Sequence, residues 1–303
     1  TDATLILKNM TIDNSGYNAD GGAWNSHNLY FNCKVEMKNV TALNAIALGE
    51  NANLTNVNIS DTGATQDTYM IWIENAGNTE IELNSCVING KSSVSNSNRA
   101  IVIKNQYAKN PGLVTLKVTN TEFLSDTKAA IYVDTTGSAN ITYDYDTNDI
   151  MGVVSGEAIE VSSTSGPVYV NGVTQLPQNA TTETINNVIT NSTDAEGNIV
   201  KDVKLALPKG STFTLDNGLA NEGDKSRNVT FVGDGTQTAD VITKATGAEG
   251  GKLSYQRGST FTFENVTVKA GEGNFDCIVC DSMTFKVCTN DGKLTLYCNA
   301  TFI

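Results

Sequence analysis

Histidine, proline and charged side chains are scarce in this chain of 303 residues. His27 is the single histidine, and proline occurs four times. A Ser-His-Asp triad or a Cys-His pair within the chain would have to use His27, and any mechanism that needs two histidines of the chain is excluded. Charged residues make up only 17% of the sequence, so uncharged polar side chains must supply much of the surface.

The charge balance is acidic, and long apolar runs are missing. The formal net charge is −13, from 20 Lys and Arg against 33 Asp and Glu. Because nucleic acids and anionic membrane surfaces attract basic proteins, we expect neither as a partner. No run of about 18 apolar residues occurs, so we expect no membrane insertion in this segment.

The sequence is instead rich in short segments in which apolar residues alternate with polar ones, the pattern of β-strands. One phrase repeats along the chain. It consists of an alternating strand, a turn that contains Asn, and a second short strand. Copies of it lie at 5–12, 35–41, 54–59, 81–88, 116–123 and 261–268.

A second phrase of alternating apolar residues is interleaved with the first. Its copies lie at 69–75, 99–105, 128–134 and 157–161. The spacing between its successive central isoleucines is 30, 30 and 28 residues, for Ile71, Ile101, Ile131 and Ile159. Self-similarity with a period of this size predicts a solenoid.

The recurring Asn has a physical explanation in such a coil. A coil of parallel strands must bend sharply between two strands, and Asn tolerates the left-handed backbone conformation better than most residues. Stacked coils place these side chains one above another, where their amides can form hydrogen bonds. We therefore predict a structural Asn ladder made of Asn9, Asn39, Asn56, Asn84, Asn120 and Asn265.

The most specific stretch of the sequence lies between residues 183 and 242. Residues 183–189 resemble a short capping helix, and residues 203–213 and 228–235 resemble the first strands that follow such a helix. Together with the repeats, this stretch resembles the pectin-lyase-like superfamily of right-handed parallel β-helices.

The resemblance implies an all-β solenoid in two segments. Residues 1–171 would be the C-terminal-type part of one β-helix, and residues 172–182 a linker. Residues 183–303 would be the capping helix and the N-terminal-type part of a second β-helix.

Both ends of this pattern are open. The chain begins inside a repeat, without a cap, and residue 303 falls inside a strand. An exposed solenoid end invites edge pairing and normally needs a cap. The chain could therefore be a window from a tandem array, or its ends could stack between copies. Both interpretations predict a long object built from repeated β-helix units.

Six cysteines are present, four of them between residues 277 and 298. Cys277 and Cys280 form one Cys-x2-Cys pair, but the second such pair that a zinc ribbon needs is missing. Cys280 and Cys298 are 18 residues apart, about one short coil. They can stack either as a disulfide or as buried thiols, and both alternatives stay open.

A cluster of acidic residues resembles the start of a calcium loop. It contains Asp144, Asp146 and Asp149, but it lacks the Gly at the sixth position and the closing Glu. A solvated outer face of a strand is the simpler interpretation. We therefore predict no metal and no cofactor, and we keep these three residues as the one calcium candidate.

The segment 13–28 is the candidate ligand-binding loop. It gathers Tyr17, Asp20, Trp24 and His27 among several amide side chains. Loops on a rigid scaffold often carry function, and aromatic rings beside amides and carboxylates suit sugars. The alternative is that Trp24 only anchors the loop on the solenoid.

The catalytic motifs that the resemblance implies for polygalacturonase-like members (Asn-Thr-Asp, Asp-Asp, Gly-His-Gly and Arg-x-Lys) do not occur. We therefore expect a non-enzymatic extracellular or cell-surface protein, adhesin-like or fibre-forming. Its expected partners are copies of itself, end to end, and glycans. A polysaccharide lyase or hydrolase of the same fold, or a degenerate relative of one, and a glycan-binding module are the alternatives.

Overall fold

The computed structural model divides by its internal contacts into two units, Thr1–Gly172 (unit 1) and Val173–Ile303 (unit 2). Each unit is described by itself. The residues that the structure describes are 3–13, 29–43, 45–60, 69–89, 99–124, 129–143, 159–178, 180–192, 199–208, 210–214, 227–233, 241–243, 252–254, 259–269, 275–278, 282–291, 294–296 and 298–303.

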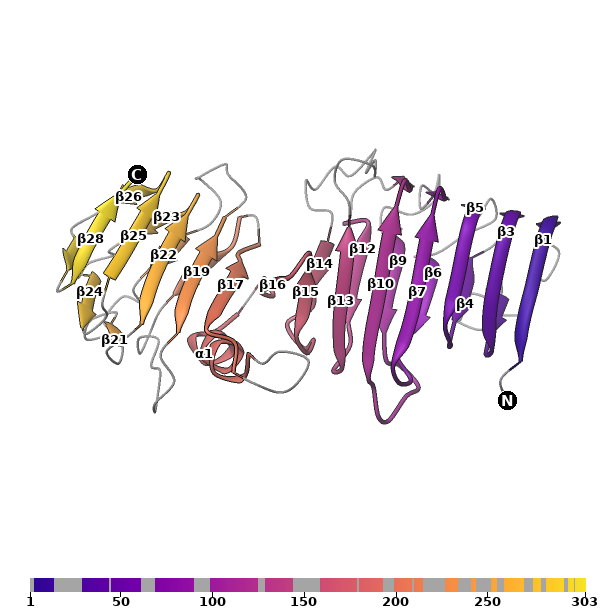
Figure 1. Ribbon diagram of the computed structural model, residues 1–303, viewed down its shortest axis with the longest axis horizontal. Helices are drawn as coiled ribbons and strands as arrows, with labels where there is room; N and C mark the ends of the chain where they lie inside the picture. The colour runs from indigo at the N-terminus through magenta and orange to yellow at the C-terminus, as the bar shows by residue number, and fades with distance from the viewer. Residues whose placement is uncertain are drawn as a thin grey trace, which may run out of the picture. The chain divides into compact units, whose positions relative to one another are not determined.

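Unit 1 contains two β-sheets (Figure 1). The first sheet consists, in spatial order, of β1 (Thr4–Ile12), β3 (Lys34–Ala42), β5 (Ala52–Ser60), β7 (Thr79–Asn84), β10 (Leu113–Thr119), β13 (Ser138–Tyr143) and β15 (Val168–Val170), with β8 (Val87–Asn89) beside β5 and β11 (Glu122–Leu124) beside β8. The second sheet consists, in spatial order, of β14 (Ile159–Val161), β12 (Ile131–Asp134), β9 (Arg99–Lys104), β6 (Tyr69–Glu74), β4 (Ile46–Leu48) and β2 (Leu29–Phe31).

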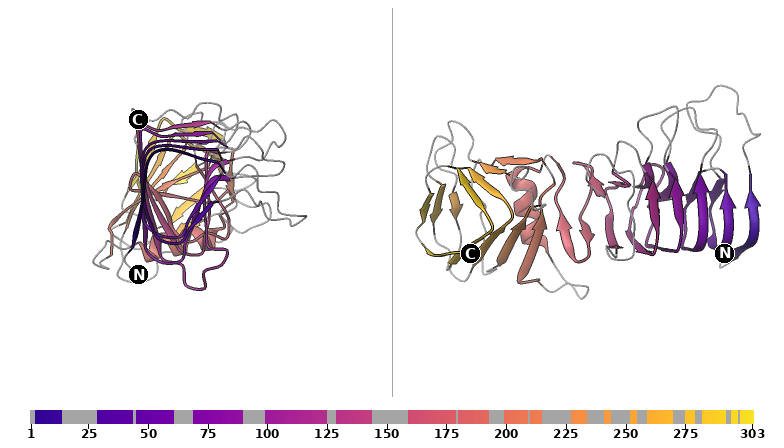
Figure 2. Two further views of the ribbon diagram at one scale, coloured as in Figure 1. Left: turned by 90° about the vertical axis from the view of Figure 1, so that its right-hand side faces the viewer. Right: turned by 90° about the horizontal axis from the view of Figure 1, so that it is seen from above.

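The chain of unit 1 passes back and forth between these two sheets. Each return adds a strand beside the one laid down in the previous passage, and the pairings described in both sheets are parallel. The strands of unit 1, coloured indigo to magenta, therefore stand side by side in Figure 2. Apolar side chains from both sheets, such as Leu54 from β5 and Ile71 from β6, form one buried core.

A backbone corner within the first sheet explains its side-chain pattern. In β3, Val35 and Met37 are buried, Asn39 adopts a φ of 54°, and Val40 and Ala42 are buried again. The left-handed residue shifts the period-two alternation by one position. Both halves of the strand can therefore face the same core although the chain bends between them.

Unit 2 is also built from parallel strands. One sheet contains, in spatial order, β16 (Val173–Gln175), β17 (Asp202–Ala206), β19 (Asn228–Val232), β22 (Thr260–Glu264), β25 (Ser282–Lys286) and β28 (Asn299–Phe302). The two smaller sheets are β18 (Thr212–Thr214), β20 (Val241–Thr243), β23 (Thr267–Lys269) and β26 (Thr289–Asp291), and β21 (Lys252–Ser254), β24 (Phe275–Ile278) and β27 (Leu294–Leu296).

The core of unit 2 contains a column of stacked phenylalanines. Phe231, Phe263, Phe285 and Phe302 occupy equivalent positions on β19, β22, β25 and β28. Their ring centroids are 5.4, 5.5 and 4.9 Å apart, and adjacent rings lie within 14° of parallel. The strand spacing of a parallel sheet therefore sets the ring spacing, and each ring covers the one before it.

The helix α1 (Thr182–Asn191) covers the core of unit 2 next to β17. Thr181 is its N-cap, and the Thr181 hydroxyl accepts a hydrogen bond from the Thr184 backbone N–H. Ile185 and Ile189, one turn apart, are buried in the apolar core of unit 2. The buried Arg227 donates from Nε to the Ile189 carbonyl at 3.4 Å, which satisfies a carbonyl of the last turn.

The segment that the sequence predicts to be a linker contains β16. This strand pairs with β17. Thr174 is buried between two half-buried neighbours, the alternation that a strand on a core produces. The helix expected at 183–189 extends from Thr182 to Asn191. The described part of the chain is thus all-β with this one helix, and its described strand pairs are parallel.

Candidate functional site

The left-handed corners of unit 1 bring the first three predicted ladder residues together. Asn39 donates from Nδ2 to Asn9 Oδ1 at 2.9 Å, and Asn56 donates from Nδ2 to Asn39 Oδ1 at 2.8 Å. Asn9, Asn39 and Asn56 have φ values of 53°, 54° and 53°. Asn120 and Asn265 also have positive φ, at 48° and 56°.

Asn84 does not occupy the corner position that the sequence analysis gave it. The left-handed residue of that turn is Ser85, with a φ of 56°, and Asn84 ends β7 opposite Thr55 of β5. The register explains the difference. The two inward residues on either side of the corner, Leu83 and Cys86, leave room for two residues between them, and the second of these takes the left-handed conformation.

Two further left-handed corners were not predicted. Asn171 has a φ of 50°, and its side chain both accepts from the Tyr143 backbone N–H and donates to the Tyr143 carbonyl. Val287 has a φ of 50° although it is β-branched, which is an unfavourable residue type for this conformation. Val287 follows Phe285 at the same distance as Asn265 follows Phe263, so the repeat imposes the conformation.

Among the described cysteines with an assigned exposure, Cys86 is buried, and Cys33, Cys288 and Cys298 are half-buried. The Cys86 thiol is buried and donates to the Leu54 carbonyl at 3.3 Å. Burial raises the pKa of the Cys86 thiol and, likewise, the pKa of the Cys288 thiol. Cys298 is half-buried against the core of unit 2, and its predicted partner Cys280 lies outside the described residues.

Two further predicted sites also lie outside the described residues. These are the candidate ligand-binding residues Tyr17, Asp20, Trp24 and His27 and the calcium candidates Asp144, Asp146 and Asp149. Within the described part of the chain, no group of three or more His, Cys, Asp or Glu side chains is placed to hold a metal ion. No helix in the same part is both long and apolar enough to cross a membrane.

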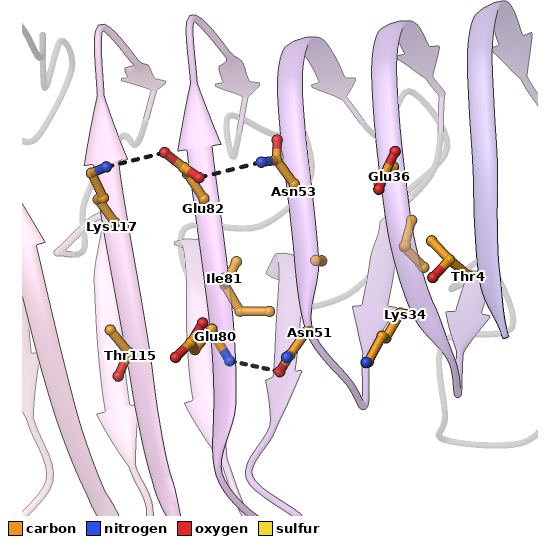
Figure 3. A pocket seen from close by; sticks show the side chains of 12 residues that line it. Thr4, Lys34, Glu36, Asn51, Asn53, Glu80, Ile81, Glu82, Thr115 and Lys117 are labelled. Carbon is orange, nitrogen blue, oxygen red and sulfur yellow. Dashed lines mark hydrogen bonds and ion pairs between the residues drawn. The ribbon is translucent and has the colours of Figure 1, made fainter. Parts of the chain in front are cut away.

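A shallow polar groove of about 440 Å³ runs across the outward face of the first sheet of unit 1 (Figure 3). Glu82 lies towards the Lys117 end of the groove and accepts from Asn53 Nδ2 and from Lys117 Nζ, each at 3.2 Å. The Glu80 backbone N–H donates to Asn51 Oδ1 at 2.9 Å. The Glu82 carboxylate is therefore already paired within the groove.

The outward face of the second sheet of unit 1 is chemically different. Because its strands pair in register, residues that are about 17 to 30 positions apart in the sequence form a row across it. Tyr30 of β2, Ala47 of β4, Trp72 of β6, Val102 of β9 and Tyr132 of β12 occupy equivalent positions. Three aromatic rings thus alternate with two small or aliphatic side chains.

Further side chains contact the aromatic residues of this row. The Tyr107 ring is nearly parallel to the indole, at a centroid distance of 6.2 Å, and the Tyr69 ring meets the indole edge-on at 6.3 Å. Arg99 lies 3.9 Å from the centre of the Tyr132 ring and forms an ion pair of 3.0 Å with Glu160. We call Trp72, Glu74, Arg99, Tyr107 and Tyr132 the aromatic cluster.

Glu74 is the buried carboxylate of the aromatic cluster, with 2% of its surface exposed. Its Oε1 accepts from the backbone N–H groups of Tyr107 and Ala108, at 2.8 and 3.1 Å. These contacts hold the segment that carries Tyr107 over β6. Burial and then the negative charge of Glu74 raise the pKa of the nearby Tyr30.

The aromatic cluster also contains polar atoms that are buried without a partner. Among the side chains of the described residues, they are Trp72 Nε1, Glu74 Oε2 and Arg99 Nη1. All three belong to the adjacent strands β6 and β9. Buried polar groups in proteins are nearly always hydrogen-bonded, so their concentration at one place marks this face as the candidate site.

The sequence analysis missed the aromatic cluster, although a signal for it was present. The second phrase identifies the strands of this sheet by their inward isoleucines. The outward residues next to those isoleucines are Trp72, Val102, Tyr132 and Glu160, and they form the row only when the copies are aligned at a spacing of about 30.

The outer strands of each unit expose apolar side chains. On β1, Leu5, Ile6 and Met10 are 38%, 53% and 44% exposed. On β28 and directly after it, Phe302 and Ile303 are 66% and 72% exposed. Among the described residues, β1 and β28 each pair on one side only, with β3 and β25.

Comparison with known proteins gives no family for the chain. No family model, no curated protein and no solved structure matches it.

Proposed function

We propose that the two units are right-handed parallel β-helices of the pectin-lyase-like kind. The alternation of the chain between stacked parallel sheets supports this fold, because parallel strands joined by such crossovers are right-handed in nearly all proteins. The ladder of Asn9, Asn39 and Asn56 and the column of phenylalanines support it as well, since both need coils that repeat with constant register.

We propose further that the protein is a non-enzymatic, adhesin-like or fibre-forming component of an extracellular or cell-surface structure, and that its β-helices stack or continue end to end. The observation that carries this proposal is the pair of open, apolar strand edges, β1 and β28. An unpaired parallel edge is a template for another strand, and exposed apolar residues favour its coverage.

The occupant that fits each edge is the opposite edge of a second copy. Ala300 and Phe302 continue the buried rows of Met283 and Phe285, so their side chains face inward. On β1, Leu5 and Leu7 lie opposite the buried Val35 and Met37 and face inward in the same way. A parallel stack therefore places Ala300 opposite Leu5 and Phe302 opposite Leu7, apolar on apolar.

Sedimentation velocity and electron microscopy of the purified chain over a range of concentrations test this function. We expect rods that lengthen with concentration while their width stays constant. Phe302→Asp should keep the chain monomeric, because it places a charge in the stacked interface. Ile199→Asp replaces another exposed apolar residue, away from both edges, and should leave assembly unchanged. A chain that stays monomeric at every concentration, or a Phe302→Asp variant that assembles normally, would contradict the proposal.

A further inference from the structure

The three unpartnered polar atoms of the aromatic cluster point to a ligand on this face of unit 1. Trp72 Nε1, Glu74 Oε2 and Arg99 Nη1 are the unpartnered buried side-chain atoms within the described residues, and all lie on β6 and β9. Each such atom destabilises a fold, because no hydrogen bond offsets its loss of water. In the groove on the first sheet, by contrast, the Glu82 carboxylate accepts from both Asn53 and Lys117.

The chemistry of these atoms defines the complementary ligand. The Trp72 indole N–H and the Arg99 guanidinium donate hydrogen bonds, and the Glu74 carboxylate oxygen accepts one. Trp72 and Glu74 both contact Tyr107, so a ligand at that point accepts from one group and donates to the other. The second donor, Arg99, lies over Tyr132 on the same face of the sheet. Hydroxyl groups both accept and donate, and neighbouring hydroxyls on a sugar ring do so at fixed spacing.

The aromatic rings supply the apolar half of the site. The indole of Trp72 and the ring of Tyr107 are nearly parallel, with centroids 6.2 Å apart, so the rings are offset and neither fully covers the other. Tyr107 is 65% exposed, and its ring can turn outward without leaving a core. That rotation opens the indole face, and with it Glu74 Oε2, to a ring-shaped ligand with an apolar face.

The local charge selects against acidic ligands. Arg99 pairs with Glu160 at 3.0 Å, and Lys104 pairs with Asp134 at 3.5 Å. Glu74 has no cation partner among the described residues, so the centre of the aromatic cluster carries a negative charge. The net charge of −13 on the whole chain acts in the same direction.

From these observations we infer that the aromatic cluster of unit 1 binds a neutral saccharide. One sugar ring packs against Trp72 beside Tyr107, and hydroxyls of the saccharide accept from Trp72 Nε1 and donate to Glu74 Oε2, while Arg99 Nη1 is a further donor over Tyr132. This site differs from the segment 13–28 that the sequence analysis favoured, and it does not depend on the end-to-end stacking of copies.

The test is affinity electrophoresis and titration calorimetry with soluble neutral polysaccharides, a β-glucan, a mannan and a galactan, and with polygalacturonate as the acidic comparator. The Phe302→Asp background keeps binding separate from self-assembly. Trp72→Phe removes the indole N–H and keeps an aromatic ring. Trp24→Phe makes the same change at the only other tryptophan and is the matched control.

We expect binding to at least one neutral polysaccharide and none to polygalacturonate. Trp72→Phe should weaken binding about 10-fold, the loss of one hydrogen bond in a desolvated site, and Trp24→Phe should not. Arg99→Lys tests the second donor should Trp72→Phe shift the unfolding midpoint. Absence of binding to all neutral polymers, binding to polygalacturonate alone, or weakening by Trp24→Phe but not by Trp72→Phe or Arg99→Lys would overturn the inference.

Discussion

The Asn corner at residue 39 allows a sharp test of what stabilises unit 1. Asn39 combines a left-handed φ of 54° with two side-chain hydrogen bonds, to Asn9 and from Asn56. Asn39→Ala loses both hydrogen bonds. It also places in the left-handed conformation a residue that has a Cβ but no side-chain group to form a local hydrogen bond. The bonds are exposed and contribute about 0.5 kcal/mol each, and the backbone term is about 1 to 2 kcal/mol. We expect a loss of about 2 to 3 kcal/mol.

Glycine separates the two contributions. Asn39→Gly also loses both hydrogen bonds but adopts the left-handed conformation without steric cost, so it should be less destabilising than Asn39→Ala by about 1 kcal/mol. Asn53 is the matched control, because its side chain also forms two exposed hydrogen bonds, with Glu82 and Thr55, but its backbone is an extended strand. At Asn53 the order should reverse, with Gly worse than Ala.

Urea unfolding followed by tryptophan fluorescence measures these differences for unit 1 alone. Both tryptophans of the chain, Trp24 and Trp72, belong to this unit. The slope of the free energy against urea concentration should stay constant across the variants, so the midpoints report stability. If Gly and Ala rank in the same order at Asn39 and at Asn53, backbone conformation is not the reason for Asn at the corner, and the reasoning is refuted.

Three other predictions concern Val287, Gly112 and Cys86. Val287→Asn should stabilise unit 2 by about 1 kcal/mol, read from thermal unfolding, because it removes a β-branched residue from a φ of 50°; an unchanged or lower midpoint would count against strain there. Gly112→Ala should destabilise unit 1 by more than about 2 kcal/mol in urea, because its Cβ would lie 2.5 Å from the backbone carbon of Gly77; a loss near zero would contradict this close packing. Because burial raises the pKa of Cys86, the unfolded chain loses that proton first, and the stability of unit 1 should fall as pH rises above the ordinary pKa of a thiol. The stability of Cys86→Val should not show the part of this decrease that comes from the Cys86 thiol. Equal dependence of stability on pH in the wild-type chain and in Cys86→Val would refute the assignment of the decrease to Cys86.

The repeated strands could be predicted from the sequence because each coil repeats the same pattern of apolar and polar residues. Copies such as 35–41 and 54–59 alternate apolar and polar residues and mark the corner with Asn, and the structure places β3 and β5 there as adjacent parallel strands. The corner at Ser85 could not be assigned from residue preference, because Asn84 is the better left-handed residue. The spacing of Leu83 and Cys86 toward the core decided it, so packing overrode local propensity.

The aromatic cluster shows why the site was harder to predict than the fold. Sequence reasoning looked for residues that are neighbours in one loop, and segment 13–28 met that criterion. In a stack of parallel strands, however, the nearest neighbours of Trp72 across the sheet are Ala47 and Val102, which lie 25 and 30 residues away in the sequence. A functional site on such a surface is formed by residues from successive coils rather than by neighbours in the sequence. A row of aromatic and charged residues separated by small ones can be recognised only once the register of the strands is known. The buried face of each coil sets that register. The buried face carries no information about what the outer face binds.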